Sequence, residues 1–107
     1  MISPNRGNVS SMSRRPRTPA WDDYVRRLGL TLQRERIRLA LSQEDVAYAA
    51  GLTRSHYQQL EKGRSRPDTA ANPSLYTLAS LATVLNVDIR ELLPATLDGV
   101  DDGSSVA

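Results

Sequence analysis

Residues 41–63, LSQEDVAYAAGLTRSHYQQLEKG, contain two short helix-forming stretches separated by a glycine, and this segment constrains the fold more than any other. Ser42 and the aspartate three residues later form a capping box, with aspartate in place of the usual glutamate or glutamine. Gly51 can take the left-handed conformation that ends the first helix, and Thr53 suits the N-cap of the next. The segment therefore predicts two short helices joined by a tight turn, the second of which ends at Gly63.

Small residues on both sides of the turn indicate that the two helices pack closely. Helices joined by a turn of a few residues approach each other only where small side chains line the contact. The residues that permit this approach are Ala47, Ala49, Ala50 and Gly51. The second helix then turns Tyr57 and Leu60 toward the core and leaves its other face free, and its N-terminus presents N–H groups suited to phosphate. The free face carries Arg54, Ser55 and Gln59, with Gln58 near its edge.

Apolar residues at helical spacing predict three more helices. The first follows Pro19 and an acidic pair that suits a helix N-terminus, and its apolar stripe comprises Val25, Leu28, Leu32 and Leu39. The fourth helix in chain order begins after Ser74, with apolar residues Leu75, Leu78, Ala79, Leu81, Ala82 and Leu85. A short fifth helix begins after Asp88 and stops before Pro94. No segment alternates as a half-buried strand does, so the fold class is all-α, with five short helices.

The two ends of the chain differ in composition from the helical part. Residues 1–20 are rich in Ser, Pro, Arg and Asn, and we expect a disordered basic arm that can add non-specific affinity for a polyanion or enter a minor groove. Residues 96–107 are acidic and rich in Gly and Ser, which predicts a disordered tail. Residues 21–95 form the single folded domain between them.

Charge is divided unevenly along the chain. Residues 1–66 carry 13 Arg and Lys against six Asp and Glu, whereas residues 67–107 carry one Arg against six acids. Such asymmetry indicates a polyanionic partner for the basic half, although charged residues also simply solvate a surface.

Composition also excludes several classes of protein. The chain has no cysteine and one histidine, which excludes disulfides, Cys-based zinc sites and multi-histidine metal sites. No apolar run is long enough for a membrane span, and the basic N-terminus lacks the apolar core of a secretory signal, so we expect a cytoplasmic protein. We expect neither an enzyme nor a cofactor, because the only histidine falls in the outward helix and no phosphate loop or carboxylate pair appears.

Residues 30–93 resemble the helix-turn-helix domain of the lambda, 434 and Cro repressor type, also called the Xre family. The matching residues are Leu32, Arg36, Leu41-Ser42-Gln43-Glu44, Val46-Ala47, Gly51, Thr53, Tyr57, Leu60-Glu61, Gly63, Asn72-Pro73-Ser74-Leu75, Thr77-Leu78, Leu81-Ala82, Leu85 and Val87. The resemblance implies a compact five-helix bundle of the lambda repressor-like DNA-binding type.

The resemblance also implies roles for individual residues. Gln43 matches a glutamine that contacts a DNA phosphate and braces the recognition helix, while Arg36 and Glu61 match a partly buried ion pair. The residues expected to contact bases are Thr53, Arg54, Ser55, Gln58 and Gln59. The residues expected to contact the DNA backbone are Gln43, His56, Lys62, Arg64 and Arg66. The stretch SRPDTAA before Asn72 makes the following loop several residues longer than the family's, and His56 stands where a small polar residue is commoner.

The leading hypothesis is a sequence-specific regulator of transcription that binds double-stranded DNA as a homodimer. It would act as a repressor at a two-fold operator whose half-sites lie about 10 base pairs apart. The alternative is an antitoxin-like or other protein-interaction module that uses the same fold. Trp21 and Tyr24 precede the resembling region and either cap the core or contact a protein partner.

Overall fold

The structure, a computed structural model, describes residues 18–95. The tail expected at 96–107 and nearly all of the arm expected at 1–20 lie outside the described residues. Helix α2 begins at Pro19, so the folded part starts two residues before the boundary that the sequence predicted.

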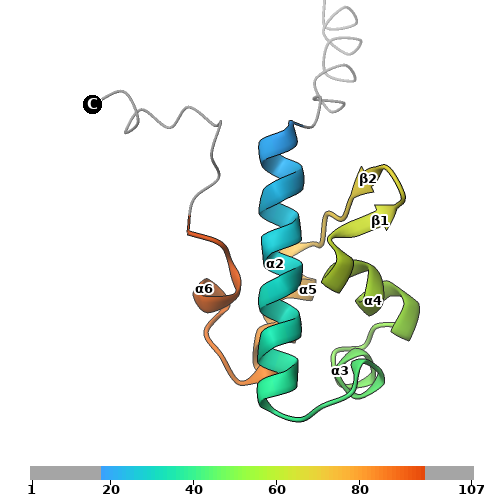
Figure 1. The fold of residues 1–107 in the computed structure, drawn as a ribbon. Coiled ribbons are helices and arrows are strands. Elements are labelled where there is room, and N and C mark those ends of the chain that lie inside the picture. Colours follow the sequence, from blue (N-terminus) through green and yellow to red (C-terminus); the bar gives the residue numbers. More distant parts are fainter. Residues whose placement is uncertain (1–17, 96–107) are drawn as a thin grey trace, which may run out of the picture.

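Five helices and one small hairpin make up the described part of the chain (Figure 1). The elements are α2 (Pro19–Arg38), α3 (Gln43–Ala49), α4 (Arg54–Lys62), β1 (Arg64–Arg66), β2 (Thr69–Ala70), α5 (Leu75–Leu85) and α6 (Ile89–Leu92). The long helix α2 runs through the middle, with α3, α4 and the hairpin on one side of it and α6 on the other (Figure 1).

Side-chain caps fix the start of α3, α4, α5 and α6 as the sequence predicted, and Thr18, which was not predicted, caps α2. The Ser42 hydroxyl accepts a hydrogen bond from the Asp45 N–H at 2.9 Å, and the Asp45 carboxylate accepts one from the Ser42 N–H at 3.1 Å, which completes the capping box. Thr53 accepts from the His56 N–H at 3.0 Å, and Ser74 and Asp88 cap α5 and α6. Caps of this kind each stabilise a helix by about 1 kcal/mol.

All five described helices contribute buried side chains to the core. Its largest fully buried side chains are Tyr57, Leu32, Leu81, Leu85, Leu92, Val25 and Val46. Two apolar residues of the predicted α5 rhythm depart from it. Leu75 is 73% exposed, because it is the first residue of α5 and lies beyond the edge of the core. Ala79 is exposed as well, so the buried face of α5 comprises Leu78, Leu81, Ala82 and Leu85.

The prediction of an all-α fold with a long loop after α4 is wrong in one respect. The strands β1 and β2 pair antiparallel, with Arg64 opposite Ala70 and Arg66 opposite Thr69. The turn between them contains Pro67 and Asp68, residue types that favour turns. Every residue of β1 is exposed, so the strand has no buried face and no alternating pattern from which sequence could predict it.

Two negative findings concern residues 18–95 only. None of the helices there combines the length and the apolar character that crossing a bilayer requires. No group of three or more His, Asp or Glu side chains in this range is placed to hold a metal ion.

Candidate nucleic-acid interface

Helix α4 packs one side against the core and exposes its polar side to solvent. Tyr57 and Leu60 are buried, whereas Arg54 and Ser55 are exposed and Gln59 is half-buried. Thr53 and His56 are exposed at the N-terminus of the helix. The outward face that the sequence predicted is therefore accessible within the monomer.

The turn before α4 has the predicted geometry. Gly51 has a φ of 76°, in the left-handed region, and the Leu52 N–H donates to the Ala47 carbonyl at 2.8 Å. Ala47 is buried, but Ala49 is exposed and does not line the close contact, contrary to expectation. The turn thus depends on backbone conformation at Gly51 and on Ala47 more than on a general run of small residues.

A second glycine, which the sequence analysis did not single out, lets α2 and α4 touch through their backbones. A Cβ added to Gly29 would lie 2.3 Å from the Glu61 carbonyl oxygen and 2.6 Å from that of Leu60. Gly29 falls inside a helix between two buried leucines, Leu28 and Leu32. A glycine inside a helical pattern marks a position to check for close packing, but it does not name the element that approaches.

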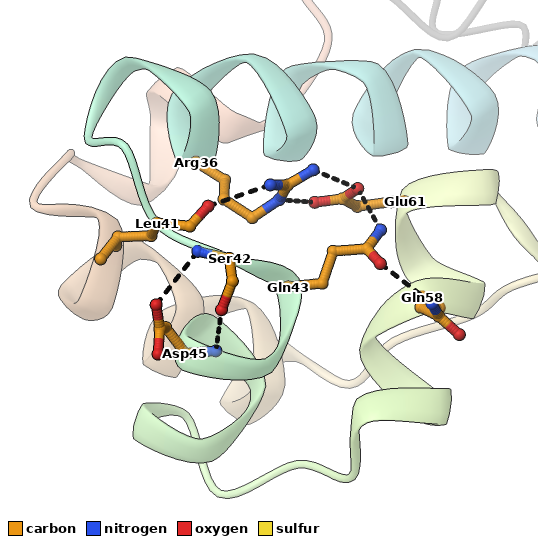
Figure 2. Close-up of polar contacts among 7 residues, drawn as sticks. All are labelled: Arg36, Leu41, Ser42, Gln43, Asp45, Gln58 and Glu61. Carbon is orange, nitrogen blue, oxygen red and sulfur yellow. Dashed lines mark hydrogen bonds and ion pairs between the residues drawn. The ribbon is translucent and has the colours of Figure 1, made fainter.

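The Arg36–Glu61 ion pair joins the same two helices and is largely shielded from solvent. The Arg36 Nε lies 2.6 Å from the Glu61 Oε2, and its Nη2 lies 3.2 Å from Oε1 (Figure 2). The two side chains are 13% and 5% exposed. The Arg36 Nη1 also donates to the Leu41 carbonyl at 3.0 Å, so the guanidinium fixes the chain between α2 and α3 as well.

The surroundings of this pair shift three pKa values. Burial alone would raise the pKa of Glu61, but hydrogen bonds from Arg36 and Gln43 outweigh it, and the pKa of Glu61 is lowered. The Glu61 carboxylate in turn raises the pKa of Arg36. Burial, followed by the nearby Glu61 carboxylate, raises the pKa of Tyr57. Glu61 is therefore a carboxylate and Arg36 a cation throughout the neutral range.

Two glutamines extend the ion pair to the edge of the outward face. The Gln43 Nε2 donates to the Glu61 Oε1 at 2.8 Å, and the Gln58 Nε2 donates to the Gln43 Oε1 at 2.9 Å (Figure 2). The bracing contact between Gln43 and α4 is thus present. The hydrogen bond between Gln58 and Gln43 was not predicted from the sequence.

Three cations lie at the C-terminal end of α4 and on the hairpin. Lys62, Arg64 and Arg66 are all exposed, and the hairpin stands beside α4 on the same side of α2 (Figure 1). The Arg64 Nη1 donates to the Pro67 carbonyl at 3.2 Å, across the turn. Gly63, with a φ of 75°, accepts a hydrogen bond from the Ala71 N–H at 3.0 Å, which fixes the base of the hairpin.

Trp21 and Tyr24 pack within the described part of the chain. Their rings stack with centroids 5.8 Å apart and an angle of 13° between the planes. The Tyr24 hydroxyl donates to the Pro94 carbonyl at 3.2 Å, and Trp21 packs against the core. Of the two alternatives that the sequence left open, the structure shows the first, because the pair ties α2 to the segment after α6.

The lowered pKa of Glu61 predicts a loss of stability in acid. A carboxyl group whose pKa is lower in the folded state stabilises that state fully above its unfolded pKa. This contribution is lost as the pH falls below about 4.5, the ordinary value for glutamate, and through the folded pKa. Thermal unfolding followed by circular dichroism across this range should show the melting temperature falling. The Glu61→Gln variant should show a shallower fall, and equal slopes in parent and variant would contradict this assignment.

Comparison with known proteins places the chain among regulators. The family model described as a helix-turn-helix domain matches residues 27–95. The ImmF control region 10 kDa protein of Bacillus phage phi105 is 28% identical over 78 residues, which cover 73% of this chain and 80% of that protein. The crystal structure of the restriction-modification controller protein C.AhdI from Aeromonas hydrophila is similar, with a TM-score of 0.57 and 35% identity. That match covers 64% of this chain and 96% of the controller protein.

The family match covers most of the described residues and includes the whole α3–turn–α4 unit together with the Arg36–Glu61 pair. It agrees with the resemblance to the lambda, 434 and Cro type that the sequence carries, and it is a match to a regulatory family and not to an enzyme family. The chain belongs to the helix-turn-helix family of DNA-binding regulators.

Proposed function

We propose that this protein is a sequence-specific regulator of transcription that inserts α4 into the major groove of double-stranded DNA. The observation that carries the proposal is the polar, solvent-facing side of α4, which no other part of residues 18–95 covers. A major groove admits an α-helix, and the side chains on such a helix read the edges of the bases.

The side chains divide by the chemistry they offer to DNA. Arg54, near the tip of α4, is suited to guanine because its guanidinium can donate to both O6 and N7. The residues proposed to contact bases are Thr53, Arg54, Ser55, Gln58 and Gln59. The residues proposed to contact phosphates are Gln43, His56, Lys62, Arg64 and Arg66, which fix the position of the protein without reading sequence.

We further propose that the protein acts as a homodimer in the cytoplasm and represses transcription at a two-fold operator. Half-sites about 10 base pairs apart would place two copies of α4 on one face of the duplex. The names of the two relatives, a controller protein and a control region protein, support a regulatory role. Binding over a promoter would then exclude polymerase sterically.

Arg54→Ala and Arg64→Ala should have different effects on DNA binding. Arg54→Ala is expected to relax the preference at one base position, by about 1–3 kcal/mol, because it removes a base contact. Arg64→Ala is expected to weaken binding to all sequences alike and to flatten the dependence of log affinity on log salt by about one unit. Selection of bound oligonucleotides from a random pool, followed by titrations at several salt concentrations, measures both.

The selection experiment also tests the proposal as a whole. A parent protein that enriches no sequence would overturn it. An unchanged profile for Arg54→Ala, with a sequence still enriched by the parent, would instead show that α4 is not the element that reads bases.

One observation favours the alternative, a protein-interaction module. Leu30 and Ile37 are 52% and 60% exposed, and seven residues apart they share one face of α2. Gel filtration and pull-down from the native source discriminate between the DNA-binding regulator and the protein-interaction module. A tight stoichiometric protein partner, together with weak DNA affinity that does not change with salt, would support the protein-interaction module.

A further inference from the structure

The hydrogen bonds that lead from Glu61 to Gln58 can run in only one direction. A carboxylate accepts hydrogen bonds and cannot donate them, so the end of the Gln43 amide that faces Glu61 must be its NH₂ group. The Gln43 oxygen then faces Gln58, and only the NH₂ group of Gln58 can satisfy it. The chemistry of Glu61 thus fixes the orientation of both amides, whichever way each was first placed.

The Gln58 amide consequently has a defined orientation. Its NH₂ group points at Gln43, and its oxygen points away from Gln43 (Figure 2). Gln58 is half-buried and lies three or four residues from Ser55 and Lys62, both exposed, so it borders the outward face of α4. The group it offers at that border is a hydrogen-bond acceptor.

We propose that Glu61, acting through Gln43, makes Gln58 select adenine, and this inference rests on the proposed function. In the major groove adenine N6 and cytosine N4 are donors, whereas guanine O6 and thymine O4 are acceptors. Adenine ranks first, since its N7 can also accept from the second N–H of Gln58. Gln58 is the residue that contacts the base, and Gln43 and Glu61 are positioning residues that do not.

An unconstrained glutamine would discriminate less. Rotation of its terminal amide by half a turn exchanges the acceptor for a donor, which suits guanine or thymine as well. In this protein the rotation would set the Gln58 oxygen against the Gln43 oxygen at 2.9 Å. Rotating both amides would set the Gln43 oxygen against the Glu61 carboxylate at 2.8 Å. Either arrangement loses a hydrogen bond to a partly buried group, so the outward acceptor is retained.

The test compares Gln43→Met, Gln58→Met and the double variant with the parent in selection from a random pool. Methionine matches glutamine in length and offers no donor, so each single change breaks the chain of hydrogen bonds without a change of charge. Gln58→Met identifies the base pair that Gln58 reads. At that pair the parent should prefer A·T over G·C by about tenfold, and Gln43→Met should reduce this preference to near parity. The double variant should lose no more there than Gln58→Met alone.

Several outcomes would overturn the inference while the proposed function stands. One is a parent that prefers G·C over A·T at the pair that Gln58→Met identifies, a result that does not depend on whether Gln43→Met folds. A second is a Gln43→Met profile unchanged at that pair, and a third is additive loss in the double variant. A melting curve for each variant and the Arg64→Ala profile, which should keep every base preference, serve as controls. A parent that selects no sequence would overturn the proposed function and this inference together.

Discussion

Gly29→Ala is expected to lower the free energy of unfolding by about 3 kcal/mol, although alanine is the better helix former. Alanine favours a helix interior over glycine by about 1 kcal/mol. Here the added Cβ would meet the backbone carbonyl oxygens of Glu61 and Leu60 at 2.3 and 2.6 Å, and no side-chain rotation can relieve those contacts. Helix α4 would have to move away from α2, and overpacking of this kind usually costs more than the helix preference returns.

The melting temperature of Gly29→Ala should fall by more than about 10 °C, measured by circular dichroism or calorimetry. DNA affinity should fall with it, since α4 carries the proposed reading face. Leu30→Ala is the matched control, because Leu30 is the next residue of the same helix and is 52% exposed. Its change in stability should stay within about 0.5 kcal/mol. A Gly29→Ala protein as stable as the parent would show that α2 and α4 do not approach as closely as described.

Arg36→Ala is expected to lower the free energy of unfolding by about 3 kcal/mol. The variant would leave the Glu61 carboxylate, 5% exposed, without its bidentate partner, and the Leu41 carbonyl without its donor. Removing one member of a buried pair costs more than the pair itself contributes, because the remaining charge stays desolvated. This single substitution would remove the hydrogen bonds that join α2 to both the α2–α3 turn and α4.

The matched control for Arg36→Ala is Arg38→Ala, two residues further along α2. Arg38 also makes an ion pair, with its Nε 2.7 Å from Glu35, but its side chain is 52% exposed. An exposed pair contributes at most about 1 kcal/mol, so the two variants should differ by several degrees or more in melting temperature. Equal melting temperatures for the two would contradict the importance assigned to burial of the Arg36–Glu61 pair.

The candidate site could be predicted only in part from the sequence. The outward position of Arg54 and Ser55 follows from the helical spacing that buries Tyr57 and Leu60, and it was predicted. The Arg36–Glu61 pair came from the resemblance and is present at hydrogen-bonding distance. The bond between Gln43 and Gln58 was not predicted, because helical spacing gives the side of a helix on which a residue lies and not the neighbour that its amide meets.

The sequence by itself determined where α3, α4, α5 and α6 begin. Caps such as Ser42 with Asp45, and the left-handed turn at Gly51, act within one turn of backbone, so the residues that encode them are adjacent in the chain. Only the tertiary structure decided the contact of Gly29 with α4, the β1–β2 hairpin and the direction of the amides from Glu61 to Gln58. The glycine contact and the amide direction depend on groups that folding brings together from separate elements, and the hairpin contains a strand with no buried face. None of these features leaves a periodic pattern in the sequence.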